Sequence, residues 1–86
     1  MSEFDGRVIV VTGATGGLGG AVARAFLDVG AIVAGVSRGP AGKAPAGQKY
    51  LEVTADVATA DGARMAVDTV LAATGRIDAL AHLVGG

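Results

Sequence analysis

The sequence lacks cysteine and tryptophan altogether, and its 86 residues include one tyrosine, two phenylalanines, two prolines and one histidine. Without cysteine there is no disulfide and no thiolate metal site, and a lone histidine argues against a histidine-based metal cluster. A chain this short buries only roughly 60% of its unfolded surface, and this one has few aromatic side chains to bury. Both features predict a low intrinsic stability. The length predicts a single domain at most, residues 1–86.

Charge of either sign is also scarce. The chain has seven Lys and Arg residues and eight Asp and Glu residues, which give a net charge of −1. No basic stripe is present to neutralise a nucleic-acid backbone. The first five residues are acidic where a signal peptide would be basic, and the longest weakly polar stretch, residues 13–36, is interrupted by Arg24 and Asp28. We therefore expect a cytoplasmic protein with no nucleic-acid partner and no membrane association.

Four apolar or alternating segments have the character of strands, and the first, Val-Ile-Val-Val, is typical of a strand that is covered on both faces. These segments are residues 8–11, 32–36, 50–54 and 79–84. The Gly-rich and Pro-containing stretch 39–47 predicts a loop with no helix of its own.

Two further segments have apolar residues at helical spacing. The first helix is expected from Gly17, with Gly30 as its stop, and the second from the N-cap Thr59 to a stop at Gly75. The expected core side of the first helix is Leu18, Ala21, Val22, Ala25, Phe26 and Val29. That of the second helix is Ala63, Ala66, Val67, Val70 and Leu71.

This alternation of strands and helices predicts an α/β fold. Strands that are separated by helices pair in parallel through right-handed crossovers, so we expect a Rossmann-like, doubly wound parallel sheet. The expected strand order is 3-2-1-4, and we expect the sheet to be truncated after its fourth strand. An open sheet of this kind has an exposed edge and an apolar face, through which it could form a homo-oligomer.

The glycine-rich segment 12–19, Thr-Gly-Ala-Thr-Gly-Gly-Leu-Gly, lies between the first strand and the first helix. In that position backbone N–H groups and the positive end of the helix dipole face a crevice where a pyrophosphate can bind. The alternative is a tight turn that serves packing only. The strand-turn-helix context favours phosphate binding.

With these features the chain resembles the N-terminal, cofactor-binding half of a short-chain dehydrogenase/reductase. Thr12, Gly13, Gly17 and Gly19 match the family's T-G-x-x-x-G-x-G. Asp-Val at positions 56–57 matches its adenine-contacting pair, and Gly-Arg-Ile-Asp-Ala-Leu at 75–80 resembles the segment that leads into strand four. The family's N-N-A-G is here His-Leu-Val-Gly at 82–85, which keeps the glycine and loses both asparagines.

An extended branch of the family has the loop T-G-x-x-G-x-x-G, which Gly13, Gly16 and Gly19 also fit. The 22 positions from Asp56 to Asp78 leave room for a full helix of roughly 15 residues, about 22 Å long, with its turns. The extended branch typically has a shorter segment at this point, so the spacing favours the single-domain branch.

The resemblance implies a set of cofactor-binding residues. Around the pyrophosphate and its ribose it places Gly13, Thr15, Gly17, Leu18 and Gly19, and near the adenine Asp56 and Val57. Ser37, Arg38, Val84 and Gly85 complete the expected site. Asp56 has the alternative interpretation of a turn carboxylate.

The end of strand two, Ser37-Arg38, bears on the choice of cofactor. An acidic residue there would accept hydrogen bonds from a ribose 2′-OH, whereas a cation attracts a 2′-phosphate. No acidic residue occurs between Asp28 and Glu52. The sequence therefore favours NADP, with NAD as the alternative.

No catalytic or metal-binding residue is assigned within the chain. Tyr50 is followed four places on by Thr54, so it does not reproduce the family's Tyr-x-x-x-Lys pair, and a lone His82 on an apolar strand is interpreted as structural. The resemblance places that pair and its accompanying Ser beyond Gly86.

The expected function is the NAD(P)-binding portion of an oxidoreductase that transfers hydride between a nicotinamide and a carbonyl or alcohol substrate. We expect the 86-residue chain to be inactive alone, so whether it is itself an enzyme stays open. The sequence does not indicate the substrate. The alternative is a non-catalytic nucleotide-binding or self-association module, as a fragment or a truncated product.

Overall fold

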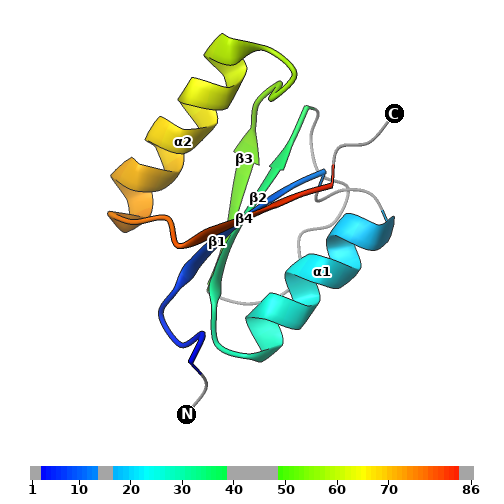
Figure 1. The fold of residues 1–86 in the computed structure, drawn as a ribbon, viewed down its shortest axis with the longest axis vertical. Coiled ribbons are helices and arrows are strands. Elements are labelled where there is room, and N and C mark those ends of the chain that lie inside the picture. Colours follow the sequence, from blue (N-terminus) through cyan, green and yellow to red (C-terminus); the bar gives the residue numbers. More distant parts are fainter. Residues whose placement is uncertain (1–2, 14–16, 39–48, 84–86) are drawn as a thin grey trace.

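A computed structural model describes residues 3–13, 17–38 and 49–83. A parallel sheet of β1 (Val8–Thr12), β2 (Ile32–Ser37), β3 (Tyr50–Thr54) and β4 (Ala79–His82) lies between two helices, α1 (Gly17–Asp28) and α2 (Ala60–Thr74) (Figure 1). The strand order is β3-β2-β1-β4. The predicted fold class and strand order are confirmed, and the loop expected at 39–47 lies outside the described residues.

The central strand β1 is covered on both faces, as its unbroken apolar sequence predicts. Val8 and Val10 pack in the cluster beneath α2, whereas Ile9 and Val11 pack in the cluster beneath α1. All four side chains are buried. This strand therefore holds the two helical layers together.

The buried side of α1 differs from the predicted one. Ala23 is buried, and Phe26 packs partly buried against the same cluster, but Leu18 is 69% exposed and Val29 is exposed. Ala23 is buried in the cluster that α1 covers, Val22 and Leu27 pack partly buried against the same cluster, and Gly19 is also buried. Burial is therefore centred about one residue away from the expected stripe.

The ends of α2 were predicted correctly. The Thr59 hydroxyl accepts a hydrogen bond from the Gly62 N–H at 3.0 Å, and Gly75, at φ +81°, donates its N–H to the Leu71 carbonyl at 2.8 Å. The predicted core side is correct at Ala66 and Val70 and wrong at Val67 and Leu71, which are exposed. The buried residues of α2 are Gly62, Ala66 and Val70.

Neither α1 nor α2, the helices of the described residues, has the length and apolarity that a membrane crossing requires.

Candidate functional site

Parallel pairing brings the carboxyl ends of the strands to one edge of the sheet, which is where α1 also begins (Figure 1). Gly13 directly follows β1, Ser37 ends β2, and Asp56 and Val57 follow β3. Residues predicted from three separate parts of the sequence thus lie along the same edge. In open α/β sheets this edge is where ligands bind.

The turn after β1 starts with a backbone that favours glycine. Gly13 has φ +74°, and its N–H donates to the Val36 carbonyl at 2.9 Å, which ties the start of the turn to β2. Helix α1 begins at Gly17, and the N–H groups of its first turn lack intrahelical partners. An anion is favoured at such an end by those N–H groups and by the helix dipole.

Other members of the predicted set have contrasting environments. Leu18 is exposed and Gly19 is buried. Ser37 is half-buried, and its carbonyl accepts the Ala55 N–H at 2.9 Å, while Arg38 is exposed. Thr15, Val84 and Gly85 lie outside the described residues.

Asp56 organises the turn between β3 and α2. Its Oδ1 accepts the Ala58 N–H at 3.0 Å, and its carbonyl accepts both the N–H and the hydroxyl of Thr59, at 3.2 and 3.0 Å. A β-carbon on Gly62 would collide with that carbonyl, so glycine is required for this approach of the helix. The turn interpretation of Asp56 is therefore correct. Its Oδ2 makes no hydrogen bond with the described residues, and contact with adenine stays a prediction.

A groove of about 210 Å³ opens on the α2 side of the same edge. Its walls come from three strands, from α2 and from Val57, and are mostly apolar. The lining residues are Val10, Thr12, Val36, Val57, Ala63, Ala66, Val67, Leu80 and His82. A flat apolar group with polar atoms at its rim fits such a surface.

Two polar side chains meet at one end of this groove. Thr12 and His82 are partners in the β1–β4 register, and the Thr12 Oγ1 lies 2.7 Å from the His82 Nδ1. The same Oγ1 accepts the Leu83 N–H at 3.2 Å. Sequence reasoning interpreted His82 as structural but missed its partner, because 70 positions separate the two residues and only the strand register brings them together.

Tyr50 lies on β3, partly buried against the α1-side cluster. Burial, and then the charge of Glu52, raise the pKa of its phenol above the ordinary value. This environment keeps the phenol protonated.

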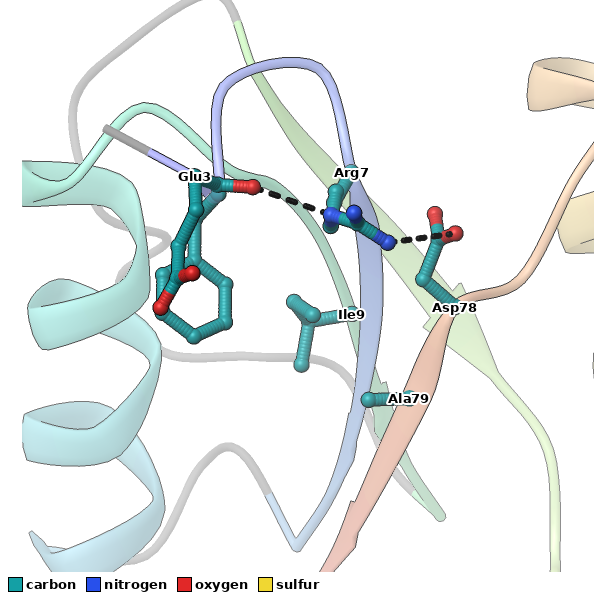
Figure 2. Close-up of a pocket in the computed structure, with 6 residues that line it drawn as sticks. Glu3, Arg7, Ile9, Asp78 and Ala79 are labelled. Carbon is teal, nitrogen blue, oxygen red and sulfur yellow. Dashed lines mark hydrogen bonds and ion pairs between the residues drawn. The ribbon is translucent and has the colours of Figure 1, made fainter. Parts of the chain in front are cut away.

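The amino end of the β1–β4 pair has a charged arrangement that sequence reasoning did not assign (Figure 2). The Asp78 Oδ2 accepts the Val8 N–H at 2.8 Å, and Arg76 donates to both carboxylate oxygens, at 2.9 and 2.7 Å. Arg76, followed by the Val8 N–H, holds the pKa of the Asp78 carboxyl below its ordinary value. Arg7 adds a longer ion pair of 3.7 Å.

A second pocket, of about 230 Å³, lies at this amino end (Figure 2). It is lined by Glu3, Phe4, Arg7, Ile9, Asp78 and Ala79. On its wall Arg7 pairs with the Asp78 carboxylate and donates its Nε–H to the Glu3 carbonyl at 2.9 Å. In the part of the chain that the structure describes, no group of three or more acidic, histidine or cysteine residues could hold a metal ion.

Comparisons with known proteins place this geometry in a family. The family model described as short chain dehydrogenase matches residues 7–86. An uncharacterized oxidoreductase of Methylorubrum extorquens is 38% identical over 93 residues, a match that covers 99% of this chain and 38% of that protein.

Solved structures agree with the family match. The ligand-free aldohexose dehydrogenase of Thermoplasma acidophilum superposes with a TM-score of 0.86 at 32% identity, over 98% of this chain and 31% of that one. The 3-ketoacyl-(acyl-carrier-protein) reductase of Brucella melitensis, complexed with NADH, gives a TM-score of 0.84 at 33% identity, over 91% and 34% of the two chains. The chain thus spans about a third of the length of these relatives. With its strand order, its glycine turn and a family match over nearly all of its length, the chain belongs to the short-chain dehydrogenase family.

Proposed function

We propose that residues 1–86 form a single, partial Rossmann domain that binds a nicotinamide dinucleotide for a short-chain dehydrogenase. The observation that carries this proposal is the positive φ of Gly13 at the end of the central strand, together with the N-terminus of α1 that begins at Gly17. The Brucella relative that is complexed with NADH supports it. In the whole protein the reaction would be hydride transfer with a carbonyl or alcohol substrate.

The residues of this chain fit such a cofactor. Backbone N–H groups from Gly13 and from the first turn of α1, residues 17–19, would hold the pyrophosphate, since Gly13, Gly17 and Gly19 have no side chain to block a close approach. The Oδ2 of Asp56 and the backbone of Val57 would contact the adenine, and Val57 already lines the apolar groove. Thr15, Val84 and Gly85 keep their predicted places in the site.

When bound, the nicotinamide supplies or accepts the hydride. The residues of this chain would bind and orient the cofactor, and none of them is assigned a proton transfer. Positioned proton transfer contributes about 10² to 10⁴ in rate, so turnover by the 86-residue chain alone should be near background.

We further propose a preference for NADP over NAD. Ser37 ends β2 at the nucleotide edge, and Arg38, the next residue, is exposed. A guanidinium attracts a 2′-phosphate and forms charge-assisted hydrogen bonds with it. The opposite preference would need an acidic residue at this point, and the sequence has none between Asp28 and Glu52.

Isothermal titration calorimetry with NADPH and NADH tests both statements. NADPH should bind more tightly than NADH, and Arg38→Ala should remove most of the difference. Gly17→Val should abolish binding of both nucleotides while circular dichroism shows helix and strand retained, because a β-branched side chain would stand where the pyrophosphate approaches. Normal binding by Gly17→Val would refute the phosphate role of the turn, and equal affinities would remove Arg38 from the site.

Self-association is a second candidate function, favoured by one observation. Among the described strands β4 pairs only with β1, and its Leu80 is 61% exposed beside the exposed Val67. An unpaired apolar edge is a template for a further strand. Sedimentation velocity should show a dimer that Leu80→Lys dissociates; a monomer at high concentration would reject this candidate.

A further inference from the structure

We propose that one side of α2 is the docking surface for a second copy of this chain, and that the two α2 helices pack antiparallel about a twofold axis. This dimer rests on the self-association proposed above and makes it specific, because it assigns the contact to α2 and not to the edge of β4. It does not depend on nucleotide binding.

The docking surface begins with an apolar stripe on α2. Its members follow one another at spacings of three and four, which places them on one side of the helix. This α2 stripe consists of Ala60, Ala63, Val67 and Leu71. Val67 is 45% and Leu71 is 42% exposed, whereas Ala66 and Val70, which are buried against the sheet, lie on the neighbouring side of the helix. The stripe therefore faces away from the core of its own chain.

The exposed apolar surface continues from the α2 stripe onto β4. Leu80 is 61% exposed, and it lines the same groove as Ala63 and Val67. The other described helix, α1, covers the opposite face of the sheet (Figure 1). Apolar side chains from two separate elements thus form one exposed surface. Such a surface is typical of a protein–protein contact, whereas single exposed apolar residues are not.

The order of side-chain sizes along the stripe indicates the direction of packing. The small residues Ala60 and Ala63 lie in the first half of α2, and the larger Val67 and Leu71 lie in the second half. An antiparallel pair with its twofold axis level with Ala66 brings the larger half of each stripe against the smaller half of the other. At a rise of about 1.5 Å per residue, the partner's Leu71 then lies between Ala60 and Ala63. A parallel pair would instead set leucine against leucine and leave space between the alanines.

Two charged residues on one border of the stripe favour the same axis. Arg64 and Asp68 are exposed and lie one turn apart. Arg64 is two positions before Ala66 and Asp68 is two positions after it, so the twofold axis sets each Arg64 opposite the partner's Asp68. Two charge pairs form, one on each side of the axis. A parallel pair would place the two charged borders on opposite sides of the interface, where neither pair could form.

The sizes and the charges along α2 are independent features, and both fit an antiparallel pair about the same position. Complementary charges at the border of an interface set its register and the choice of partner more than its affinity. A second copy of this chain is therefore the occupant that this surface fits.

The first test changes the charges and measures dimer formation by sedimentation velocity. The parent chain should dimerise as its concentration rises. Arg64→Asp would bring acidic side chains together across the axis, and Asp68→Arg would bring basic side chains together. Each variant alone should therefore dimerise about tenfold more weakly than the parent.

An equimolar mixture of these two variants separates the dimer contact from effects within one helix. One variant supplies two acidic side chains at the border and the other supplies two basic ones, so both pairs across the axis are attractive again. The mixture should form a heterodimer about as stable as the parent dimer, which native mass spectrometry identifies by its mass. Repulsion within each helix is unchanged by mixing and cannot produce this result. A mixture that stays monomeric would overturn the antiparallel pair.

The second test compares Leu71→Lys with a matched control on the same helix, Met65→Lys. Met65 is 52% exposed, slightly more than Leu71, but it is two positions before Val67 and hence on another side of α2. Leu71→Lys should abolish the dimer, and Met65→Lys should leave it as in the parent. Equal dissociation by the two variants would overturn the assignment of the stripe. Circular dichroism should show the same helix content in both.

The remaining outcomes distinguish this dimer from the proposals above. If the parent, Arg64→Asp and Asp68→Arg all dimerise equally, the copies associate through another surface, such as the β4 edge, and the α2 dimer is wrong while self-association stands. If the parent stays monomeric at high concentration, self-association fails as well, and the stripe belongs to a different polypeptide. Binding of NADPH is measured separately, and its absence would contradict the proposed nucleotide site alone.

Discussion

The two ends of the β1–β4 pair are held in chemically different ways. At the amino end the carboxylate of Asp78 accepts the Val8 N–H and the guanidinium of Arg76. At the carboxyl end the uncharged hydroxyl of Thr12 connects His82 with the Leu83 N–H. The Val8–Asp78 contact and the contacts of the Thr12 hydroxyl join residues at least 70 positions apart in sequence.

The difference follows the division of tasks along the strands. A carboxylate with a lowered pKa and a guanidinium with a raised one stay charged at neutral pH, so the amino end keeps one state. The carboxyl end is next to the proposed nucleotide site and is held through an uncharged hydroxyl. The charged contact and the proposed nucleotide site are thus located at opposite ends of the same strand pair.

The largest loss of stability is expected from a substitution in β1 that weakens both ends of the β1–β4 pair. Ile9 is 1% exposed and lies on β1 opposite Ala79. Ile9→Ala removes buried carbon atoms and leaves a cavity, which should lower the free energy of unfolding by about 2–5 kcal/mol. Urea denaturation measures it, and hydrogen exchange should speed up at the amides of both Val8 and Leu83.

Leu80→Ala is the control for this prediction, because Leu80 is on the neighbouring strand but mostly exposed. Its unfolding free energy should change by no more than about 0.5 kcal/mol. A loss as large as that of Ile9→Ala would show that burial does not decide the stability of this strand pair.

A smaller effect is expected from Asp78→Asn, confined to the amino end. Because the pKa of Asp78 is lower in the folded chain than its ordinary value, the charged carboxylate stabilises the fold above that ordinary value. This stabilisation disappears as the pH falls through the folded pKa. The variant should be less stable than the parent at pH 7, by less than Ile9→Ala, and the two should converge in acid.

Urea denaturation at several pH values between 7 and 2 measures this difference. Exchange at the Leu83 amide should be affected less than exchange at Val8, since the lesion lies at the other end of the strands. An unchanged gap between the two chains throughout the acid range would contradict the role of the charge.

The smallest effect is expected from Arg7→Ala. The Arg7 side chain is 52% exposed, and its nitrogen lies 3.7 Å from the Asp78 carboxylate, farther than Arg76. Exposed ion pairs of this kind contribute about 0.2–1 kcal/mol, and we expect the lower end of that range. Arg76→Ala, measured by the same denaturation, should cost more, and the reverse order would make Arg7 the main partner.

The sequence was sufficient for the fold. An unbroken apolar run predicted a strand covered on both faces, and Thr59 and Gly75 predicted the ends of α2. The buried sides of the helices were shifted, because apolar periodicity does not show that small residues such as Ala23 lie nearest to the sheet.

The candidate site was predictable only in part. The glycine turn follows from local sequence, and the structure places Gly13, Ser37 and Asp56 along one edge. The Thr12–His82 and Val8–Asp78 contacts were not foreseen, because they depend on the register of two parallel strands that are distant in sequence. Binding of the cofactor by this set of residues stays a prediction.

The distance in sequence between β1 and β4 also has a kinetic consequence. A contact that closes a long loop costs more conformational entropy, and this cost arises before the contact can stabilise the chain. Chains rich in such contacts therefore fold slowly. We expect β1, α1 and β2 to associate early and β4 to add late, when the chain has been synthesised beyond residue 79. Until then the central, most apolar strand has one unpaired side, and this interval is when the nascent chain is most prone to aggregation.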